Sequence, residues 1–178
     1  MSDQENDRRT VRDSSGEPSG EKREDARRRA DKGSVCLTIP TTPDRIFRLL
    51  ADGWMYANWV VGASRVRLVE AGWPAKGSKI HHSSGLWPLL VNDTTEVIAV
   101  EPNRLLELDA RIWPVGAAWV QVRLEPDGAT RTKACMAETF HSGPGRLIPE
   151  PAIAAVMTAR NRECLRRLGM IAVNRETP

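Results

Sequence analysis

The sequence predicts an α+β fold in which a curved antiparallel sheet of six to seven strands is covered by one long C-terminal helix. Residues 64–140 contain successive runs in which apolar and polar residues alternate, with turn residues between them. Residues 149–172 instead carry apolar residues at helical spacing. Because one helix covers only part of a sheet face, a sheet that curls around it encloses either a packed core or a cavity.

The chain divides into a tail, one domain and a short end. In residues 1–33, nine basic residues balance nine acidic ones, and only four residues are apolar. Such a segment cannot bury enough apolar surface to offset the conformational entropy lost on folding, so we expect a disordered charged tail. Residues 34–172 are long enough for one sizeable core, and residues 173–178 form a C-terminal tail.

The net charge of +3 raises the question of nucleic-acid binding. The tightest basic clusters, Arg8-Arg9 and Arg27-Arg28-Arg29, lie in the tail among acidic residues. Mixed-sign runs of this kind are typical of solvated tails, so we expect no nucleic-acid partner.

The cysteines and the apolar stretches bear on the cellular compartment. Cys36, Cys135 and Cys164 are widely spaced and form no CxxC pair, which favours reduced thiols in a cytosolic protein. No apolar stretch approaches the length of about 20 residues that spans a membrane, and the N-terminus lacks the apolar segment of a signal peptide. We therefore predict a cytoplasmic protein without a membrane span.

The first elements are a strand and two short helices. Alternation over residues 34–39 predicts the strand, which ends at Pro40. Thr41 or Thr42 can cap a helix that follows, and residues 54–59 predict a second short helical turn rich in aromatic residues.

Further alternating runs, separated by Gly, Pro, Asn or Asp, predict the rest of the sheet. They cover residues 65–68, 78–84, 94–100, 106–112, 120–124 and 131–136. Asp127-Gly128 predicts a tight hairpin between the last two runs. The buried stripe of the final helix consists of Ile153, Val156, Met157, Cys164, Leu165 and Leu168.

Four segments of the sequence resemble the SRPBCC superfamily, which includes START-type lipid-transfer domains and the polyketide cyclase/dehydrase group. They are TIPTTPDRIFRLLAD (38–52), YANWVVGASRVRLVE (56–70), EVIAVEPNRLLELDAR (96–111) and RNRECLRRLG (160–169). The resemblance covers residues 34–172. None of these segments is a catalytic signature, so the pattern is specific for fold rather than for function.

The resemblance implies a helix-grip fold, in which the curved sheet wraps around the C-terminal helix. Members of the superfamily usually hold an apolar or aromatic small molecule between sheet and helix. Some are cyclases or dehydratases, and others carry lipids or hormones. The expected partner is therefore a small hydrophobic molecule, and no cofactor is expected.

Two polar residues of the predicted strands are candidates for proton transfer. His82 shares a strand face with Ile80 and Ser84, so it either faces a cavity or forms hydrogen bonds at a sheet edge. Glu138 is in phase with apolar residues of the last strand. It is either a general acid or base with a raised pKa, or a solvent-facing residue at the strand end.

Arg160 and Asn161 interrupt the apolar stripe of the final helix. Either residue could bind a carboxylate, phosphate or carbonyl of a ligand. Alternatively, Arg160 pairs with Glu138 and holds the helix to the sheet.

The aromatic residues supply the other candidates for ligand contact, because indole rings offer flat apolar walls with one donor. Trp59 could instead fill the space between the short helices and the sheet. The full set of candidate ligand-binding residues is Trp54, Tyr56, Trp59, Trp87, Leu108, Ile112, Val120, Met136, Ile153, Met157, Arg160 and Asn161.

Metal binding is not expected, although His81 and His82 are adjacent. Neighbouring side chains of a strand point to opposite faces, and only His141 and isolated cysteines remain as further ligands.

Three functions remain open from the sequence. The first is a protein that binds a small hydrophobic or aromatic molecule, lipid- or polyketide-like. The second is a cyclase/dehydratase-type enzyme in which Glu138 and His82 transfer protons. The third is a module whose charged tail recruits another protein. The sequence also leaves open whether the domain forms a homodimer.

Overall fold

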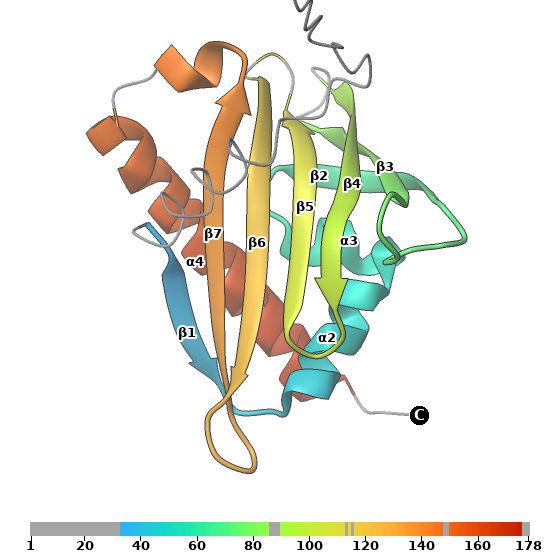
Figure 1. Cartoon of the computed structure of the whole chain (residues 1–178), viewed down its shortest axis with the longest axis vertical. Helices are drawn as coiled ribbons and strands as arrows, with labels where there is room; N and C mark the ends of the chain where they lie inside the picture. The colour runs from blue at the N-terminus through green and yellow to red at the C-terminus, as the bar shows by residue number, and fades with distance from the viewer. Residues whose placement is uncertain (1–32, 86–89, 113, 115, 148–149, 176–178) are drawn as a thin grey trace, which may run out of the picture.

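The computed structural model describes residues 33–85, 90–112, 114, 116–147 and 150–175. Its strands are β1 (Val35–Ile39), β2 (Ala63–Val69), β3 (Lys79–Ser84), β4 (Val91–Glu101), β5 (Leu105–Ile112), β6 (Gly116–Pro126) and β7 (Thr132–Ser142). They form one seven-stranded sheet in the order β1-β7-β6-β5-β4-β3-β2, in which all neighbours are antiparallel (Figure 1).

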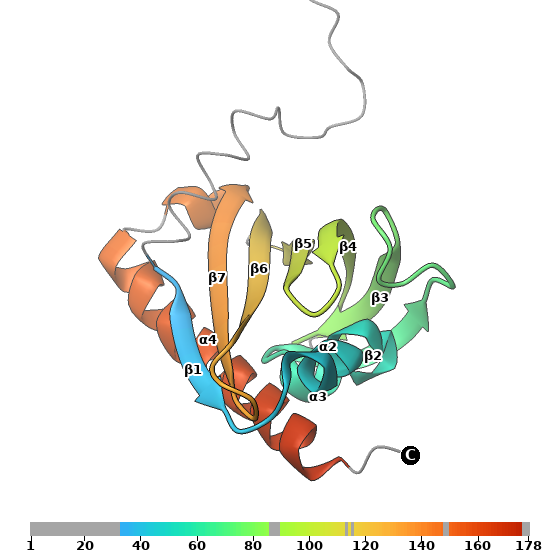
Figure 2. The same ribbon diagram turned by 60° about the horizontal axis from the view of Figure 1, so that its bottom comes forward.

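The helical elements are α2 (Pro43–Ala51), η1 (Gly53–Met55), α3 (Tyr56–Trp59), η2 (Pro144–Leu147) and α4 (Glu150–Asn174). Figures 1 and 2 show α2, α3 and α4 on the same side of the sheet. We call this side the inner face and the opposite side the outer face. The predicted α+β helix-grip fold, with two short helices after the first strand, is confirmed.

The sequence around α2 explains where that helix begins and what it buries. Pro43 occupies the first turn, and Asp44 pairs with Arg48 one turn later at 2.8 Å. Thr42 occupies the N-cap position, although its side chain makes no capping hydrogen bond. The buried side chains of the helix are Ile46, Phe47, Leu49 and Leu50.

The two halves of α4 differ in burial. Its second half packs against the sheet through the buried residues Asn161, Cys164, Leu165, Leu168 and Ala172. Between residues 154 and 160, by contrast, no residue is buried, and Val156 is 61% exposed. The predicted apolar stripe is therefore confirmed for the second half of the helix and wrong for Val156.

Strand β2 departs from simple alternation. The sequence predicts Val66 and Leu68 on one buried face, but Leu68 is 51% exposed. The pairing of β2 with β3 shifts register between these two residues, so the side chain of Leu68 is turned away from the face that Val66 shares with the core.

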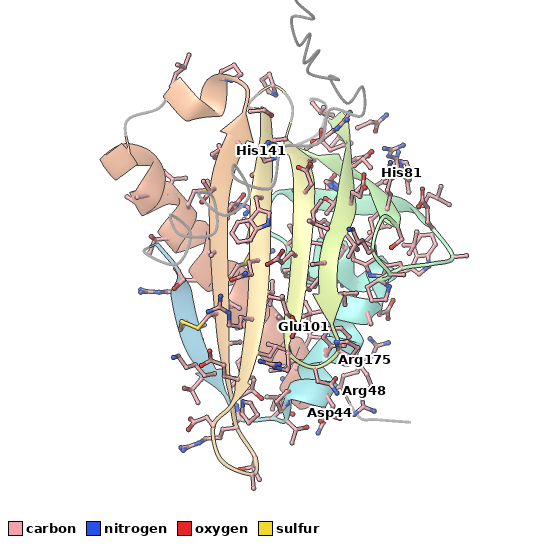
Figure 3. The ribbon with its side chains drawn as sticks, in the orientation of Figure 1. Asp44, Arg48, His81, Glu101, His141 and Arg175 are labelled. Atoms are coloured by element: carbon pink, nitrogen blue, oxygen red, sulfur yellow. A yellow bond between two sulfur atoms is a disulfide. The ribbon has the colours of Figure 1, made fainter. Side chains whose placement is uncertain are left out.

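The prediction of reduced thiols is wrong for two of the three cysteines. Cys36 of β1 and Cys135 of β7 are directly opposite each other in the sheet and form a disulfide, visible in Figure 3, whereas Cys164 is free and buried. The pairing joins residues 99 positions apart, which spacing alone does not reveal. Because disulfides are typical of oxidising compartments, the cysteines do not support a cytoplasmic location, which stays a prediction.

Among the helices in the described part of the chain, none combines the length and the apolar character that a bilayer span requires.

Replacing one buried residue of α4 tests how the helix is seated. Leu168 is fully buried, so Leu168→Ala should lower the free energy of unfolding by about 2–5 kcal/mol. Met170 lies two positions away and is 49% exposed, so Met170→Ala should change it by less than about 0.5 kcal/mol. Urea unfolding curves measure both values, and equal effects would show that α4 is not seated on the sheet as described.

Candidate functional site

A cavity of about 370 Å³ lies between the inner face of the sheet and the first half of α4. Its wall includes both buried residues and exposed ones, such as Val156, so the cavity reaches the surface beside α4. The lining residues are Tyr56, Trp59, Val60, Val61, Gly62, Ala63, His82, Ser84, Leu108, Ala110, Arg111, Val120, Met136, Glu138, Phe140, Val156, Met157 and Arg160.

The middle of the sheet gives the cavity an apolar wall. Leu108, Val120 and Met136 come from β5, β6 and β7, and each is at most 5% exposed. Each belongs to the set of alternating positions in its strand whose side chains point to the inner face and join the main core. This wall offers apolar contact and no hydrogen-bonding group.

A chain of hydrogen bonds forms one polar side of the site. The hydroxyl groups of Tyr56 and Thr95 are 3.0 Å apart, and Thr95 Oγ1 is also 3.0 Å from His82 Nε2. On the other side of the ring, Ser84 Oγ is 3.3 Å from His82 Nδ1. The Tyr56 and His82 rings also contact each other, with centroids 5.0 Å apart. These contacts hold the imidazole in one orientation.

Burial changes the proton affinities of this polar chain. Burial lowers the pKa of His82 to about 4, because the charged imidazolium loses its solvation, so the ring is neutral at pH 7. Burial also raises the pKa of Tyr56 to about 12. The cavity therefore presents a neutral imidazole and a neutral phenol.

A buried ion pair forms the second polar side. Arg160 Nη1 of α4 is 2.5 Å from Glu138 Oε2 of β7, and Arg160 Nε donates a hydrogen bond to the carbonyl of Val61 at 3.0 Å. The Glu138 side chain is 1% exposed. Its second oxygen, Oε1, has no hydrogen-bond partner among the described residues. That atom is a buried acceptor that the described residues leave unsatisfied.

Burial and pairing act in opposite directions on Glu138. Burial raises the pKa of its carboxyl group, and the adjacent guanidinium only partly offsets this. Burial alone would lower the pKa of Arg160, but interactions led by the Glu138 carboxylate outweigh it and raise that pKa, so the guanidinium remains charged. The pair is thus a fixed cation beside a carboxyl group with increased proton affinity.

The structure brings most of the predicted site residues to one cavity. The predicted residues that line it are Tyr56, Trp59, His82, Leu108, Val120, Met136, Glu138, Met157 and Arg160. Arg160 pairs with Glu138, as one of the two alternatives for Arg160 predicts. Trp59 is 2% exposed, so it also fills the space between the short helices and the sheet.

Other predicted site residues are not part of the cavity wall. Trp54 lies on η1 with its side chain turned to solvent and is 58% exposed. Asn161 is buried beside Arg160, whose Nη1 is 3.4 Å from its Oδ1, but it does not line the cavity. Trp87 and the side chains of Ile112 and Ile153 lie outside the described residues.

Sequence reasoning did not select Ser84, Thr95 or Phe140 as site residues. Ser84 and Phe140 line the cavity, and Thr95 connects Tyr56 to His82. Each is in phase with a residue of the inner face, so strict alternation could have found them. Small hydroxyl residues in a β-branched run otherwise carry no distinguishing signal.

The two adjacent histidines separate as alternation requires. His82 faces the cavity, whereas His81 is partly exposed, with its Nε2 3.7 Å from Glu70 Oε1. Within the described ranges, no three residues among His, Cys, Asp and Glu lie together as a metal-ligand set would.

A family model described as polyketide cyclase / dehydrase and lipid transport matches residues 32–170. The chain belongs to this family. The match spans the whole sheet and nearly all of α4, and it places the chain in the SRPBCC superfamily, as the resemblance predicts. No curated protein matches the chain significantly.

Solved structures show the same fold. The Zhui aromatase/cyclase from Streptomyces sp. R1128 is 16% identical, with a TM-score of 0.62 over 80% of this chain and 93% of that protein. A conserved protein from Geobacillus kaustophilus is 12% identical, with a TM-score of 0.62 over 79% of this chain and 93% of the other. A protein from Nitrosomonas europaea is 13% identical, with a TM-score of 0.57 over 78% of this chain and 92% of that protein. At these identities the likeness concerns the fold alone.

The buried His82 should make stability depend on pH. Folding lowers the pKa of His82 from 6.5 to about 4, so the unfolded chain binds the imidazole proton more tightly than the folded chain. The free energy of unfolding therefore decreases as the pH falls from 6.5 to about 4. The loss should approach about 3 kcal/mol. Urea unfolding between pH 7 and pH 4 should show this loss in the wild type and a smaller one in His82→Gln. His81→Gln is the matched control, and an equal reduction there would contradict the assignment to His82.

The Glu138–Arg160 pair should behave as a buried unit. Arg160→Met leaves a carboxylate buried without its cation and should lower the free energy of unfolding by about 3–5 kcal/mol. The double variant Glu138→Leu/Arg160→Met removes both charges and should recover part of that loss. Lys79→Met is the control, because the Lys79–Glu96 pair is at the surface and should contribute less than about 1 kcal/mol. If the double variant lost as much free energy of unfolding as the sum of Glu138→Leu and Arg160→Met measured singly, this coupling would be ruled out.

Proposed function

We propose that the chain binds a small hydrophobic or aromatic molecule, lipid- or polyketide-like, in the cavity between the sheet and α4. The observation that carries this proposal is the cavity itself, since its volume of about 370 Å³ is within the range of about 300–1,000 Å³ typical of small-molecule sites. Membership of a polyketide cyclase / dehydrase and lipid transport family supports the same ligand class.

The arrangement of polar groups indicates what such a ligand carries. The central wall of Leu108, Val120 and Met136 suits a ring or an acyl chain. Glu138 Oε1 is buried and accepts no hydrogen bond from the described residues. A ligand hydroxyl group would donate to it and satisfy a buried acceptor that otherwise lowers stability. A hydroxylated ring or chain therefore suits the site better than a plain hydrocarbon.

Paired ligands test both parts of the proposal. In a titration followed by tryptophan fluorescence, 2-naphthol should bind more tightly than naphthalene, because only the naphthol can donate to Glu138. In Glu138→Leu/Arg160→Met this preference should disappear, while naphthalene binding remains. No fluorescence change with either compound, or an unchanged preference in the double variant, would count against the proposal.

Filling the cavity supplies a second test. Ala110 lines the cavity and is 6% exposed, so Ala110→Phe should occupy ligand space and abolish naphthol binding. Trp54→Phe changes an exposed ring outside the cavity and should leave binding intact. Circular dichroism establishes that both variants fold. Retained affinity in a folded Ala110→Phe protein would place the ligand elsewhere.

A second candidate function is proton transfer in a cyclase/dehydratase-type reaction. It is favoured by two titratable groups with displaced pKa values, His82 and Glu138, which face one cavity beside the Arg160 cation. A neutral imidazole can remove a proton from the carbon beside a ligand carbonyl, whose oxygen Arg160 would stabilise. The Glu138 carboxyl group, whose proton affinity is increased by burial, would donate a proton to the departing hydroxyl group. Water then leaves, a carbon–carbon double bond remains, and the proton on His82 returns to Glu138.

The variants His82→Asn and Glu138→Gln test this second candidate on polyketide-like β-hydroxyketones. Loss of water formation in both, with ligand affinity retained, is the expected result. Turnover that survives both substitutions would remove these residues from any catalytic role.

A further inference from the structure

The outer face of the sheet contains side chains that are buried although they point away from the helices. Glu107, Gln121 and Ala137 are paired across β5, β6 and β7 and are 1%, 6% and 3% exposed. In the neighbouring row, Trp119 is 6% exposed. Trp119 and Ala137 form a hydrophobic cluster separate from the main core.

None of the helices α2, α3 and α4 in the described part of the chain lies over this patch. Helices α2, α3 and α4 all lie on the inner face (Figure 2), where the core is built. The outer face of an antiparallel sheet with helices on one side is normally in contact with water. Gln121 donates a hydrogen bond to Glu107, and a glutamate buried to 1% in such a position favours a further cover from residues outside the described ranges.

The N-terminal segment is the part of the chain long enough to provide that cover. Residues 1–32 precede the described domain, whereas the other undescribed stretches are one to four residues long. The chain enters the sheet at Val35, in the edge strand β1 next to β7. Crossing from β1 to β5 takes three strand spacings, or about 14 Å. The five residues from Arg29 to Gly33 can span about 17 Å when extended.

A shallow groove marks a path from the entry point to the patch. A hollow of about 200 Å³ on the outer face is lined by Ser34 and by residues of β1, β6 and β7, namely Cys36, Gln121, Arg123, Glu125, Lys133, Cys135 and Ala137. It therefore begins where the N-terminal segment joins the domain and ends beside the buried row. The Cys36–Cys135 disulfide lies along it and ties β1 to β7.

Beyond the groove, which carries Arg123, Glu125 and Lys133, the buried row presents acidic side chains to a basic segment. The outer face carries the carboxylates of Glu107 and Asp109 on β5, and Asp109 Oδ1 is 2.9 Å from His141 Nε2. Arg27, Arg28 and Arg29 are within eight residues of Val35. They bring the densest basic cluster of the chain within reach of these carboxylates.

We propose that residues 26–32 dock on the outer face of the chain's own sheet, over Trp119 and Ala137 and beside Glu107 and Asp109. Their composition predicts disorder for a segment standing alone, because it cannot form a core of its own. The sheet face supplies the apolar partner surface that the segment lacks. This inference concerns a surface on the opposite side of the sheet from the cavity and does not depend on ligand binding.

Hydroxyl-radical footprinting of the full chain, read by mass spectrometry, tests the docking. Trp54, at 58% exposed, and Trp59, at 2%, are internal references for free and protected indoles. In the wild type, Trp119 should be oxidised as slowly as Trp59. In the full-length variant Arg27→Glu/Arg28→Glu/Arg29→Glu its oxidation should rise several-fold toward that of Trp54. Arg8→Glu/Arg9→Glu alters the tail away from the docked part and should leave Trp119 protected.

A cross-link identifies which chain covers the patch. A short bismaleimide should join Ala30→Cys to Thr139→Cys within one chain, giving a monomer with one bound linker by mass. Trp119 oxidised as fast as Trp54 in the wild type would overturn the proposal. So would a cross-linked dimer as the main product, which would assign the cover to a second copy. Protection of Trp119 in the triple variant without any intramolecular cross-link would overturn it as well.

Discussion

The buried pair of Arg160 and Glu138 is the contact on which the architecture of the site depends. It marks the position along α4 where the helix stops packing on the sheet. After Arg160, every turn of α4 buries apolar residues, ending with Leu168 and Ala172. Before it, Val156 and Met157 of α4 line the cavity. The guanidinium also donates to the carbonyl of Val61, so one side chain connects α4, β7 and the segment after α3.

Hydrogen bonds satisfy most of the polar groups that border the cavity. A buried ion pair is tolerated when further hydrogen bonds satisfy its remaining groups, and Val61 provides one of them. Glu138 lines the cavity, and its Oε1 atom is the buried acceptor of the pair that no described residue satisfies. The polar chain from Tyr56 to Ser84 is satisfied internally, so it orients His82 without requiring a ligand. The two polar sides thus differ, because one leaves a buried acceptor unsatisfied and the other does not.

Much of this fold could be predicted from the sequence, because local patterns determined it. Alternation in the β5, β6 and β7 segments, Asp127-Gly128 at their last turn and the spacing of α4 each agree with the structure. The predictions were wrong where the structure depends on contacts between residues far apart in the sequence. The register that joins Cys36 to Cys135 and the bulge that exposes Leu68 both depend on strand pairing. Periodicity alone does not encode that pairing.

The site was predicted unevenly for the same reason. His82 and Glu138 could be assigned to a strand face, and their strands bring both to the cavity. Trp54 was selected by residue type, but the short η1 turn leaves it in solvent. Thr95 was not selected because a threonine in a β-branched run is unremarkable until its hydrogen-bond partners are known.

Diffraction from crystals held under xenon would test the existence of the cavity most directly, because xenon binds in cavities against apolar walls. The structure predicts xenon bound beside Leu108, Val120 and Met136, with α4 unmoved. Side chains packed tightly in that position, with no bound xenon, would contradict the account.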